Sequence, residues 1–292
     1  MKRSIVLSGK DVSKHVYEGL NDRISSLRKK NCIPGLAVIL VGENPASKVY
    51  VNSKTKIFES LELFTKTFKL PSITTSSDLI TLITSLNNDS KYHGILVQLP
   101  LPKHISDQDI INVISPKKDV DGFHPQNSGL LSIGKPRFIP CTPKGIMRIL
   151  DFYKIDLSGK HVVVVGRSNI VGRPISILCS LKNKGANATV TICHSGSVDI
   201  KKYTSLADVI VVALGVPNFL DKSMVKKESI IVDVGINRIK VNNKKGYKLV
   251  GDANWDDLLD HVSAITPVPG GVGPMTIAML VENTIEAAEN LS

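Results

Sequence analysis

A short apolar strand that runs directly into a glycine turn and then an amphipathic helix constrains this chain most. The strand is Val162–Val165, and the turn has the pattern G-x-S-x-x-x-G, with Gly166, Ser168 and Gly172 at its fixed positions. Such a turn presents backbone N–H groups and the positive end of a helix dipole to a pyrophosphate. The pattern departs from the common G-x-G-x-x-G, and the serine hydroxyl can add a hydrogen bond. The sequence therefore predicts a dinucleotide-binding unit.

Apolar strand segments alternate with helical segments along the chain, which is typical of parallel sheets covered by helices on both faces. We predict strands at 37–41, 65–70, 94–98, 161–165, 189–193, 208–213, 230–234 and 263–265. We predict helices at 10–28, 45–61, 78–86, 107–114, 172–183 and 275–290. The expected fold class is α/β, with a small α/β catalytic domain, a Rossmann-type domain and a ligand cleft between them.

The domain boundaries are predicted from a Pro- and Gly-rich passage, residues 129–143, which we interpret as the crossing between the two domains. The catalytic domain is then 1–143 and the Rossmann-type domain 144–273. The last helix, within 274–292, starts at Pro274, a favoured first-turn position for proline. Because it follows the second sheet, we expect it to return to the first domain.

Composition excludes several classes of protein. The chain of 292 residues has no signal-peptide pattern and no apolar run long enough for a transmembrane helix. Its four cysteines show no paired spacing and its seven histidines lie far apart, which predicts reduced thiols, a cytoplasmic location and no metal site. The net charge of +11 comes in short clusters with only 5% aromatic residues, which favours small anionic ligands over nucleic acid.

A lysine lies on a helix face that otherwise carries apolar residues. The Asn-Pro pair at 44–45 is a good N-cap and first turn, which predicts a helix to about Leu61. At about 100° per residue, Tyr50, Lys54, Ile57 and Leu61 fall in one narrow stripe, which we interpret as the buried face. Lysine is rarely buried without a partner. Lys54 either reaches the surface along its aliphatic stem or serves a buried functional site.

Two further polar residues are predicted near the carboxyl edge of the first sheet. Gln98 ends a strand that prolines then stop, and Asp121 precedes a glycine in a turn-prone segment. Each has an ordinary alternative, since Gln98 can bond its own loop and Asp121 can form an Asx turn. Together with Tyr50 and Lys54 they would surround one hole with an amide, a carboxylate, a phenol and an amine. That set can orient a heterocycle and move protons.

Five ordered motifs resemble those of the bifunctional methylenetetrahydrofolate dehydrogenase/methenyltetrahydrofolate cyclohydrolase family, over essentially the whole chain. The most specific are P-G-G-V-G-P-M-T-I at 269–277 and the run 86–101, which ends in V-Q-L-P-L. The others are Tyr50-x-x-x-Lys54, K-D-V-D-G at 118–122 and G-R-S-N-I-V-G at 166–172. On these motifs the chain is identified as a member of that family.

The resemblance implies oxidation of 5,10-methylenetetrahydrofolate with NADP⁺, followed by hydrolysis of the 5,10-methenyl product to 10-formyltetrahydrofolate. It implies that Lys54 is the key cyclohydrolase residue, that Gln98 helps to set its protonation, that Asp121 holds the pterin and that Tyr50 positions the folate. Other residues implied to contact the substrate are Val97, Leu99, Pro269, Gly270 and Gly273. Hydride transfer needs orientation only, whereas water addition needs a base, and a desolvated lysine beside a cation has a lowered pKa.

The expected cofactor is NADP. NAD-selective units usually carry an acidic residue after the second strand, but here H-S-G-S at 194–197 follows it. Arg167 could pair with a 2′-phosphate, and the resemblance implies this for Arg167 and Ser195. The full set expected to bind the cofactor is Gly166, Arg167, Ser168, Gly172, Ser195 and Ile236, the last near the nicotinamide or packed in the core. Gly196 departs from the family, where a basic residue is common, which leaves some use of NAD open.

Two other functions remain open from the sequence. The chain could be an NADP-dependent dehydrogenase of another small substrate, similar to shikimate dehydrogenase, although Gln98 and the 269–274 loop suit a pterin better. It could also be a basic nucleic-acid-binding protein. We expect polyglutamylated tetrahydrofolates as partners, no nucleic acid, no membrane, and the homodimer that the resemblance implies.

Overall fold

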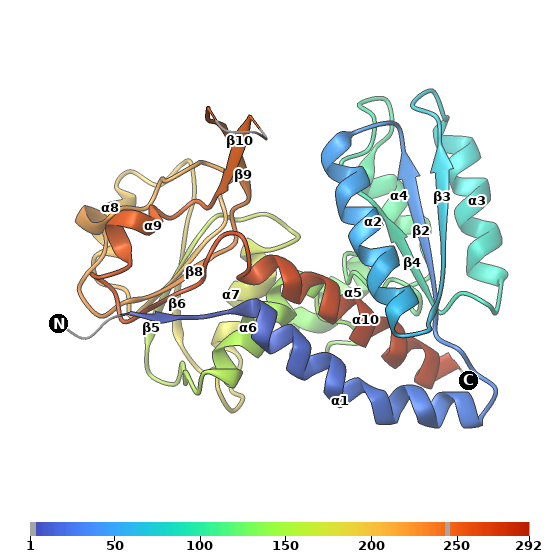
Figure 1. Cartoon of the computed structure of the whole chain (residues 1–292), viewed down its shortest axis with the longest axis horizontal. Helices are drawn as coiled ribbons and strands as arrows, with labels where there is room; N and C mark the ends of the chain where they lie inside the picture. Colours follow the sequence, from blue (N-terminus) through green and yellow to red (C-terminus); the bar gives the residue numbers. More distant parts are fainter. Residues whose placement is uncertain (1–3, 243–245, 292) are drawn as a thin grey trace. The chain divides into compact units, whose positions relative to one another are not determined.

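The computed structural model describes residues 4–242 and 246–291. The chain divides into two compact units (Figure 1). The six-stranded unit comprises residues 4–15 and 142–276, and the three-stranded unit comprises 16–141 and 277–291. Two long helices, α1 (Gly9–Lys29) and α10 (Val272–Leu291), contribute residues to both units.

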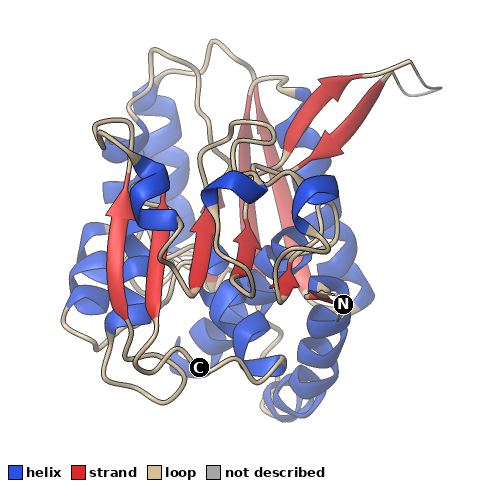
Figure 2. Ribbon diagram, turned by 90° about the vertical axis from the view of Figure 1, so that its left-hand side faces the viewer, coloured by secondary structure: helices blue, strands red, loops and turns tan. Residues whose placement is uncertain are grey.

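The six-stranded unit is built on a parallel sheet of order β1-β11-β8-β7-β5-β6. Its strands are β1 (Ile5–Val6), β5 (His161–Val165), β6 (Thr189–Cys193), β7 (Val209–Val212), β8 (Ile230–Asp233) and β11 (Ala264–Ile265). Its helices besides α1 and α10 are α6 (Cys141–Phe152), α7 (Gly172–Ser180), α8 (Ile200–Thr204), η1 (Lys222–Met224) and α9 (Trp255–Leu258). An antiparallel hairpin of β9 (Asn237–Lys240) and β10 (Tyr247–Val250) forms a separate sheet (Figure 2).

The three-stranded unit has a parallel sheet of order β3-β2-β4. Its strands are β2 (Gly35–Val41), β3 (Phe64–Leu70) and β4 (Gly94–Val97), and its own helices are α2 (Pro45–Ser60), α3 (Ser76–Asn88), α4 (Asp107–Val113) and α5 (Pro125–Ser132). All seven residues of β2 are buried. Alternate residues of β2 and β4, including Ile39 and Ile95, pack with Leu79 and Ile83 of α3 in one core cluster. The α/β prediction is confirmed in both units.

Local sequence explains where the helices begin. Asn44 Oδ1 accepts hydrogen bonds from the N–H groups of Ala46 (3.0 Å) and Ser47 (3.1 Å), so the predicted cap of α2 is confirmed. Helix α3 begins two residues before the predicted start because Thr75 and Asp78 form a reciprocal capping box.

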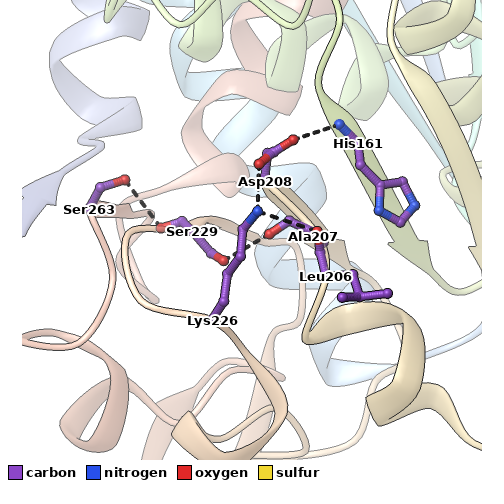
Figure 3. A network of polar contacts seen from close by, with 7 residues as sticks. All are labelled: His161, Leu206, Ala207, Asp208, Lys226, Ser229 and Ser263. Atoms are coloured by element: carbon purple, nitrogen blue, oxygen red, sulfur yellow. Dashed lines mark hydrogen bonds and ion pairs between the residues drawn. The ribbon is translucent and has the colours of Figure 1, made fainter.

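A polar network joins the amino ends of three parallel strands (Figure 3). Asp208 accepts hydrogen bonds from His161 N at 2.8 Å and from Lys226 Nζ at 2.6 Å. Beside it, Ser229 Oγ donates to Ala207 O at 2.9 Å, and Ser229 is fully buried. The network satisfies polar groups at the edge of the sheet opposite to the turn at 166–172.

Some elements differ from the prediction. The chain passes from one unit to the other within the predicted passage at 129–143, between residues 141 and 142, but α5 and α6 cover the two ends of that passage. Gly134, Pro140 and Pro143 lie near helix termini, where both residue types are tolerated. Residues 4–15, grouped with the first domain from the sequence, belong to the six-stranded unit, where Ile5 pairs with Ala264. Strand β1 has only two residues, so its apolar pattern is too short to be detected in the sequence.

The last helix returns to the three-stranded unit as expected. Residues 277–291 of α10 belong to that unit. Asn283 Nδ2 donates to Val120 O (2.8 Å) and Ile139 O (3.0 Å), and Arg23 makes two hydrogen bonds to Glu289 (2.9 and 2.6 Å). None of the described helices has the length and apolar character needed to cross a bilayer.

Candidate active site

Lys54 lies on the buried face of α2, and only 8% of it is exposed. The other buried side chains of this helix are Ser47, Val51 and Phe58. The spacing of Val51, Lys54 and Phe58 at i, i+3 and i+7 defines one stripe. The predicted burial of Lys54 is therefore confirmed, and the amine does not reach solvent along its stem.

The rest of the predicted stripe is wrong. Tyr50 is 39% exposed, and Ile57 and Leu61 are only partly buried. The buried face is centred one residue further along the helix because Phe58, which is fully buried, is the large side chain that packs inward. Lys54 lies close enough to both stripes to be buried in either case.

Gln98 supplies the hydrogen-bond partner of the buried amine. Lys54 Nζ donates to Gln98 Oε1 at 3.1 Å. Gln98 follows β4 directly, and its backbone N–H donates to Ile39 O at 2.9 Å, which extends the ladder by one residue. Its Nε2 donates to Leu99 O at 2.9 Å, so the amide oxygen is the atom that faces the lysine. Gln98 bonds its own loop and the amine at once.

Asp121 is the nearby carboxylate. Asp119, and not Asp121, organises the turn: its carboxylate accepts hydrogen bonds from Phe123 N (3.2 Å), His124 N (2.8 Å) and Asn127 Nδ2 (2.8 Å). The Asx-turn alternative for Asp121 is therefore wrong, because the neighbouring aspartate fills that role. Asp121 stays available to interact electrostatically with Lys54.

The charges of the buried Lys54 and the partly buried Asp121 act on each other. Burial lowers the pKa of Lys54, and the negative charge of Asp121 opposes that shift. Burial raises the pKa of Asp121, which the Lys54 ammonium opposes. The amine thus loses its proton more readily than an exposed lysine does, which suits a base.

A second buried lysine shows what a structural role looks like in the same unit. Lys118 is 7% exposed, and its Nζ donates to the carbonyl oxygens of Leu86 (3.0 Å) and Asp89 (2.8 Å) at the end of α3. A cation there complements the helix dipole. Lys54 instead donates to the amide oxygen of Gln98 at the carboxyl edge of the sheet, where ligands bind, and interacts electrostatically with Asp121.

In the six-stranded unit, the turn after β5 is closely packed. Gly166 has φ of +126°, and a Cβ there would overlap Ala213 O at the end of β7. A Cβ at Gly172 would overlap Gly166 O and lie 2.8 Å from the Cα of Arg167. Only glycine fits at these positions, so the turn holds one shape.

The turn offers free donors to an anion. Within the described residues, the backbone N–H groups of Arg167, Ser168 and Asn169 donate to no protein atom, and all three residues are exposed. Ser168 Oγ accepts from Val171 N (3.2 Å) and Gly172 N (3.3 Å), so it caps α7 and retains only its O–H for a ligand. Exposed donors at a helix start fit the pyrophosphate of a dinucleotide.

Ser195 lies on the turn after the neighbouring strand. Strands β5 and β6 pair with Val165 opposite Cys193, so Arg167 and Ser195 each follow a strand end by two residues. Both are exposed. The turn around Ser195 is held by Gly196 N, which donates to His194 Nδ1 at 3.0 Å. This edge carries no carboxylate directly after β6, as a 2′-phosphate requires.

The loop at 269–273 also belongs to the six-stranded unit. Gly270 has φ of +110°, and its carbonyl accepts from Lys10 N at 3.2 Å. A Cβ at Gly273 would lie 3.5 Å from Ile236 Cδ1, so these residues are neighbours. Ile236 is 43% exposed, which contradicts the core-packing alternative. The peptide before Pro269 is cis.

Val97 and Leu99 flank Gln98 differently. Val97 is 7% exposed and packs in the core with α3, and Leu99 is partly buried against the same cluster. Any substrate contact of Val97 is therefore made by its main chain.

Sequence reasoning missed residues that hold these loops. Asn283 binds Val120 O, next to Asp121, from a helix more than 160 residues away. Asp233 and Asp252 are 3% and 0% exposed at the carboxyl ends of β8 and β10. A carboxylate at the end of an apolar strand is a signal that could have found Asp233, but it does not apply to Asp252, which follows the mixed strand β10 and Gly251. No sequence signal points to Asn283.

Comparisons with family models and with known proteins all match one family. Residues 7–121 match the catalytic-domain model of tetrahydrofolate dehydrogenase/cyclohydrolase, and residues 140–292 match its NAD(P)-binding-domain model. The "Bifunctional protein FolD" of Chlamydia muridarum is 48% identical over 97% of this chain and 98% of its own length.

Solved structures agree. The bifunctional FolD methylenetetrahydrofolate dehydrogenase/cyclohydrolase of Campylobacter jejuni is 48% identical, with a TM-score of 0.93 over 98% of this chain and 99% of that one. The Trypanosoma brucei FolD, complexed with NADP and an inhibitor, is 33% identical, with a TM-score of 0.93 over 99% of both chains. Shikimate dehydrogenase of Thermus thermophilus is 15% identical, with a TM-score of 0.51, which is a likeness of fold alone.

Proposed function

This chain belongs to the tetrahydrofolate dehydrogenase/cyclohydrolase family, and from that premise we propose how its own residues divide the work. The chain is a bifunctional enzyme that oxidises 5,10-methylenetetrahydrofolate with NADP⁺ and hydrolyses the methenyl product to 10-formyltetrahydrofolate. The three-stranded unit is the folate-binding catalytic domain, and the six-stranded unit binds NADP. Only a shared fold supports the alternative that the chain is a shikimate-type dehydrogenase.

Lys54 is the base of the hydrolysis. Water attacks the methenyl carbon, its oxygen bonds to that carbon, and the neutral amine takes the proton. The hydroxyl of this adduct then loses its proton as the formyl C=O forms and the C–N5 bond breaks with its electron pair on N5. N5 takes up one proton, which the Lys54 ammonium can return, and the formyl group stays on N10. The observation that carries this role is the buried amine, 3.1 Å from Gln98 Oε1 and with a pKa lowered by burial. A cationic substrate lowers that pKa further.

Gln98 and Asp121 support the amine and the ring. The Gln98 amide is held by Leu99 O, so it keeps the Lys54 amine at one position. Asp121 is a partly buried carboxylate that can accept hydrogen bonds from pterin N–H groups. Tyr50, 39% exposed on the same helix, contacts the folate. The loop at 269–273 contributes Pro269, Gly270 and Gly273 to the same substrate.

The turn at 166–172 binds NADP. The bound cofactor supplies the hydride acceptor. The backbone N–H groups of Arg167, Ser168 and Asn169 bind the pyrophosphate, and Arg167 with Ser195 binds the 2′-phosphate. Hydride transfer needs no strong acid or base because the folate nitrogen stabilises the cation that forms. Orientation is therefore the main task of this unit.

The test is Lys54→Met, measured for both reactions on one preparation. The variant should lose methenyl hydrolysis by at least about 100-fold, since general-base catalysis contributes about that much. NADPH production from methylenetetrahydrofolate, followed spectrophotometrically, should remain measurable. Equal losses in both reactions would contradict the role given to Lys54.

Three further expectations belong with this proposal. Polyglutamylated folates suit the net charge of +11, because their tails are polyanions. A homodimer follows from the family resemblance, and sedimentation would test it. A cytoplasmic location follows from the cysteine usage.

A further inference from the structure

Two buried aspartates at the carboxyl ends of strands have no part in the roles assigned above. Asp233 ends β8 and Asp252 follows β10, and both are almost completely buried. They are directly linked, because Asp252 N donates to Asp233 Oδ1 at 3.0 Å. A buried carboxylate is costly unless donors surround it, so the donors around each one are informative.

Asp252 binds three donors from two loops. Its Oδ2 accepts from Leu214 N at 2.6 Å and Gly215 N at 2.9 Å, in the loop after β7. Its Oδ1 accepts from Asn237 Nδ2 at 2.8 Å, at the start of β9. Asp252 therefore fixes the loops after β7 and β8 relative to each other.

Asp233 completes the same arrangement. Its Oδ1 accepts from Gly235 N at 2.9 Å, and its Oδ2 accepts from Ala253 N at 2.9 Å. No side chain could be added at Gly235, because its Cβ would overlap the Asp252 carboxylate. The turn after β8 is thus packed directly on both carboxylates.

Ile236 lies between the two anchored residues. Gly235 on one side is bound by Asp233, and Asn237 on the other is bound by Asp252. Ile236 itself is 43% exposed and lies beside Gly273. Because both neighbours are bound by buried carboxylates, the exposed apolar side chain of Ile236 is held at a fixed position. A fixed, exposed apolar side chain is typical of a surface that contacts a ligand.

We propose that Asp252 and Asn237 are positioning residues for the dehydrogenase reaction, which hold Ile236 and the 214–215 loop where they contact the nicotinamide end of NADP. This inference rests on the proposed function. Hydride transfer depends on the orientation of the donor and acceptor carbons, so a small displacement of this surface lowers the rate. The phosphate turn at 166–172 makes none of these contacts. In the proposed function that turn supplies most of the affinity for NADP.

The test is Asn237→Ala, which removes one donor from the network without burying a new polar group. The expected result is a fall of at least about tenfold in the kcat of the dehydrogenase, with the KM and the calorimetric Kd for NADP⁺ changed less than about threefold. Methenyl hydrolysis should stay within about twofold, because Lys54 lies in the other unit. Asp252→Asn should do the same and also speed amide hydrogen exchange at Leu214 and Gly215.

Ser229→Ala is the matched control. Ser229 is fully buried, whereas Asn237 is partly buried, and Ser229 bonds Ala207 O at the amino edge of the same sheet (Figure 3). It should lower the melting temperature while leaving kcat of both reactions within about twofold. A fall of both reactions in Asn237→Ala by the same factor, an unchanged dehydrogenase kcat, or a rise confined to KM would each overturn the positioning role. A wild-type enzyme without NADP-dependent oxidation would instead refute the proposed function.

Discussion

Replacing Gly172 with alanine is expected to open the phosphate turn while leaving hydrolysis intact. Gly172 is buried at the first position of α7. An added Cβ would overlap Gly166 O and lie 2.6 Å from Gly166 C, whereas real Cβ contacts essentially never fall below 3.0 Å. Both atoms belong to the main chain, so no side-chain rotation relieves the overlap. The turn itself has to move.

The magnitude follows from two opposing effects. Overpacking of this kind destabilises by about 1–3 kcal/mol. The better helix propensity of alanine offsets at most about 1 kcal/mol of that. We therefore expect the free energy of unfolding to fall by about 1–2 kcal/mol. Displacement of the N–H groups of Arg167 and Ser168 should weaken NADP⁺ binding by about tenfold, which corresponds to about 1.4 kcal/mol.

Calorimetry with NADP⁺ and urea unfolding measure the two effects, and methenyl hydrolysis reports on the other unit. Gly129→Ala is the control, because a Cβ at this position in α5 meets no atom within 4 Å. That substitution should stabilise by about 0.5–1 kcal/mol. If Gly172→Ala bound NADP⁺ with wild-type affinity, the steric reasoning about this turn would be refuted.

Two other substitutions test the charges. Arg167→Ala should raise KM for NADP⁺ far more than KM for NAD⁺, since only NADP⁺ carries the 2′-phosphate; equal changes would remove that assignment. Asp121→Asn should lower the pKa of Lys54 further, because the carboxylate opposes the effect of burial. The rising limb of the hydrolysis pH profile, and the ¹⁵N titration of Lys54 Nζ, should then move to lower pH; a shift to higher pH would contradict the coupling.

Much of the fold could be predicted because the period of the apolar residues indicates which segments form strands and which form helices. The strands at 161–165 and 189–193 were predicted to the residue, since the apolar run in the first and the alternating pattern in the second are both bounded by clear turns. The hairpin of β9 and β10 was not, because its alternation is short and interrupted by charged residues. The stripe on α2 was misplaced by one residue, since a helical period cannot tell which of two adjacent faces meets the sheet.

The residues of the candidate site were likewise predictable only in part. Lys54, Gln98 and Asp121 stand out as polar residues where the pattern expects apolar ones or strand ends, so they can be found from local sequence. Asn283 and Asp252 cannot, because their importance lies in partners distant along the chain. Asp252 is an ordinary turn residue until the fold brings Leu214 N within 2.6 Å of it.

The order of residues by itself determined the two parallel sheets, the glycine turn that suits a dinucleotide and the family. Those features depend on periodicity and backbone conformation, which are local. Only the folded chain decided that the Lys54 amine is buried against Gln98 and that Asp119, not Asp121, holds the turn. It also decided that the buried Asp233 and Asp252 bind the residues on either side of Ile236. Desolvation and hydrogen-bond partners depend on which distant segments pack together, and local sequence does not encode that directly.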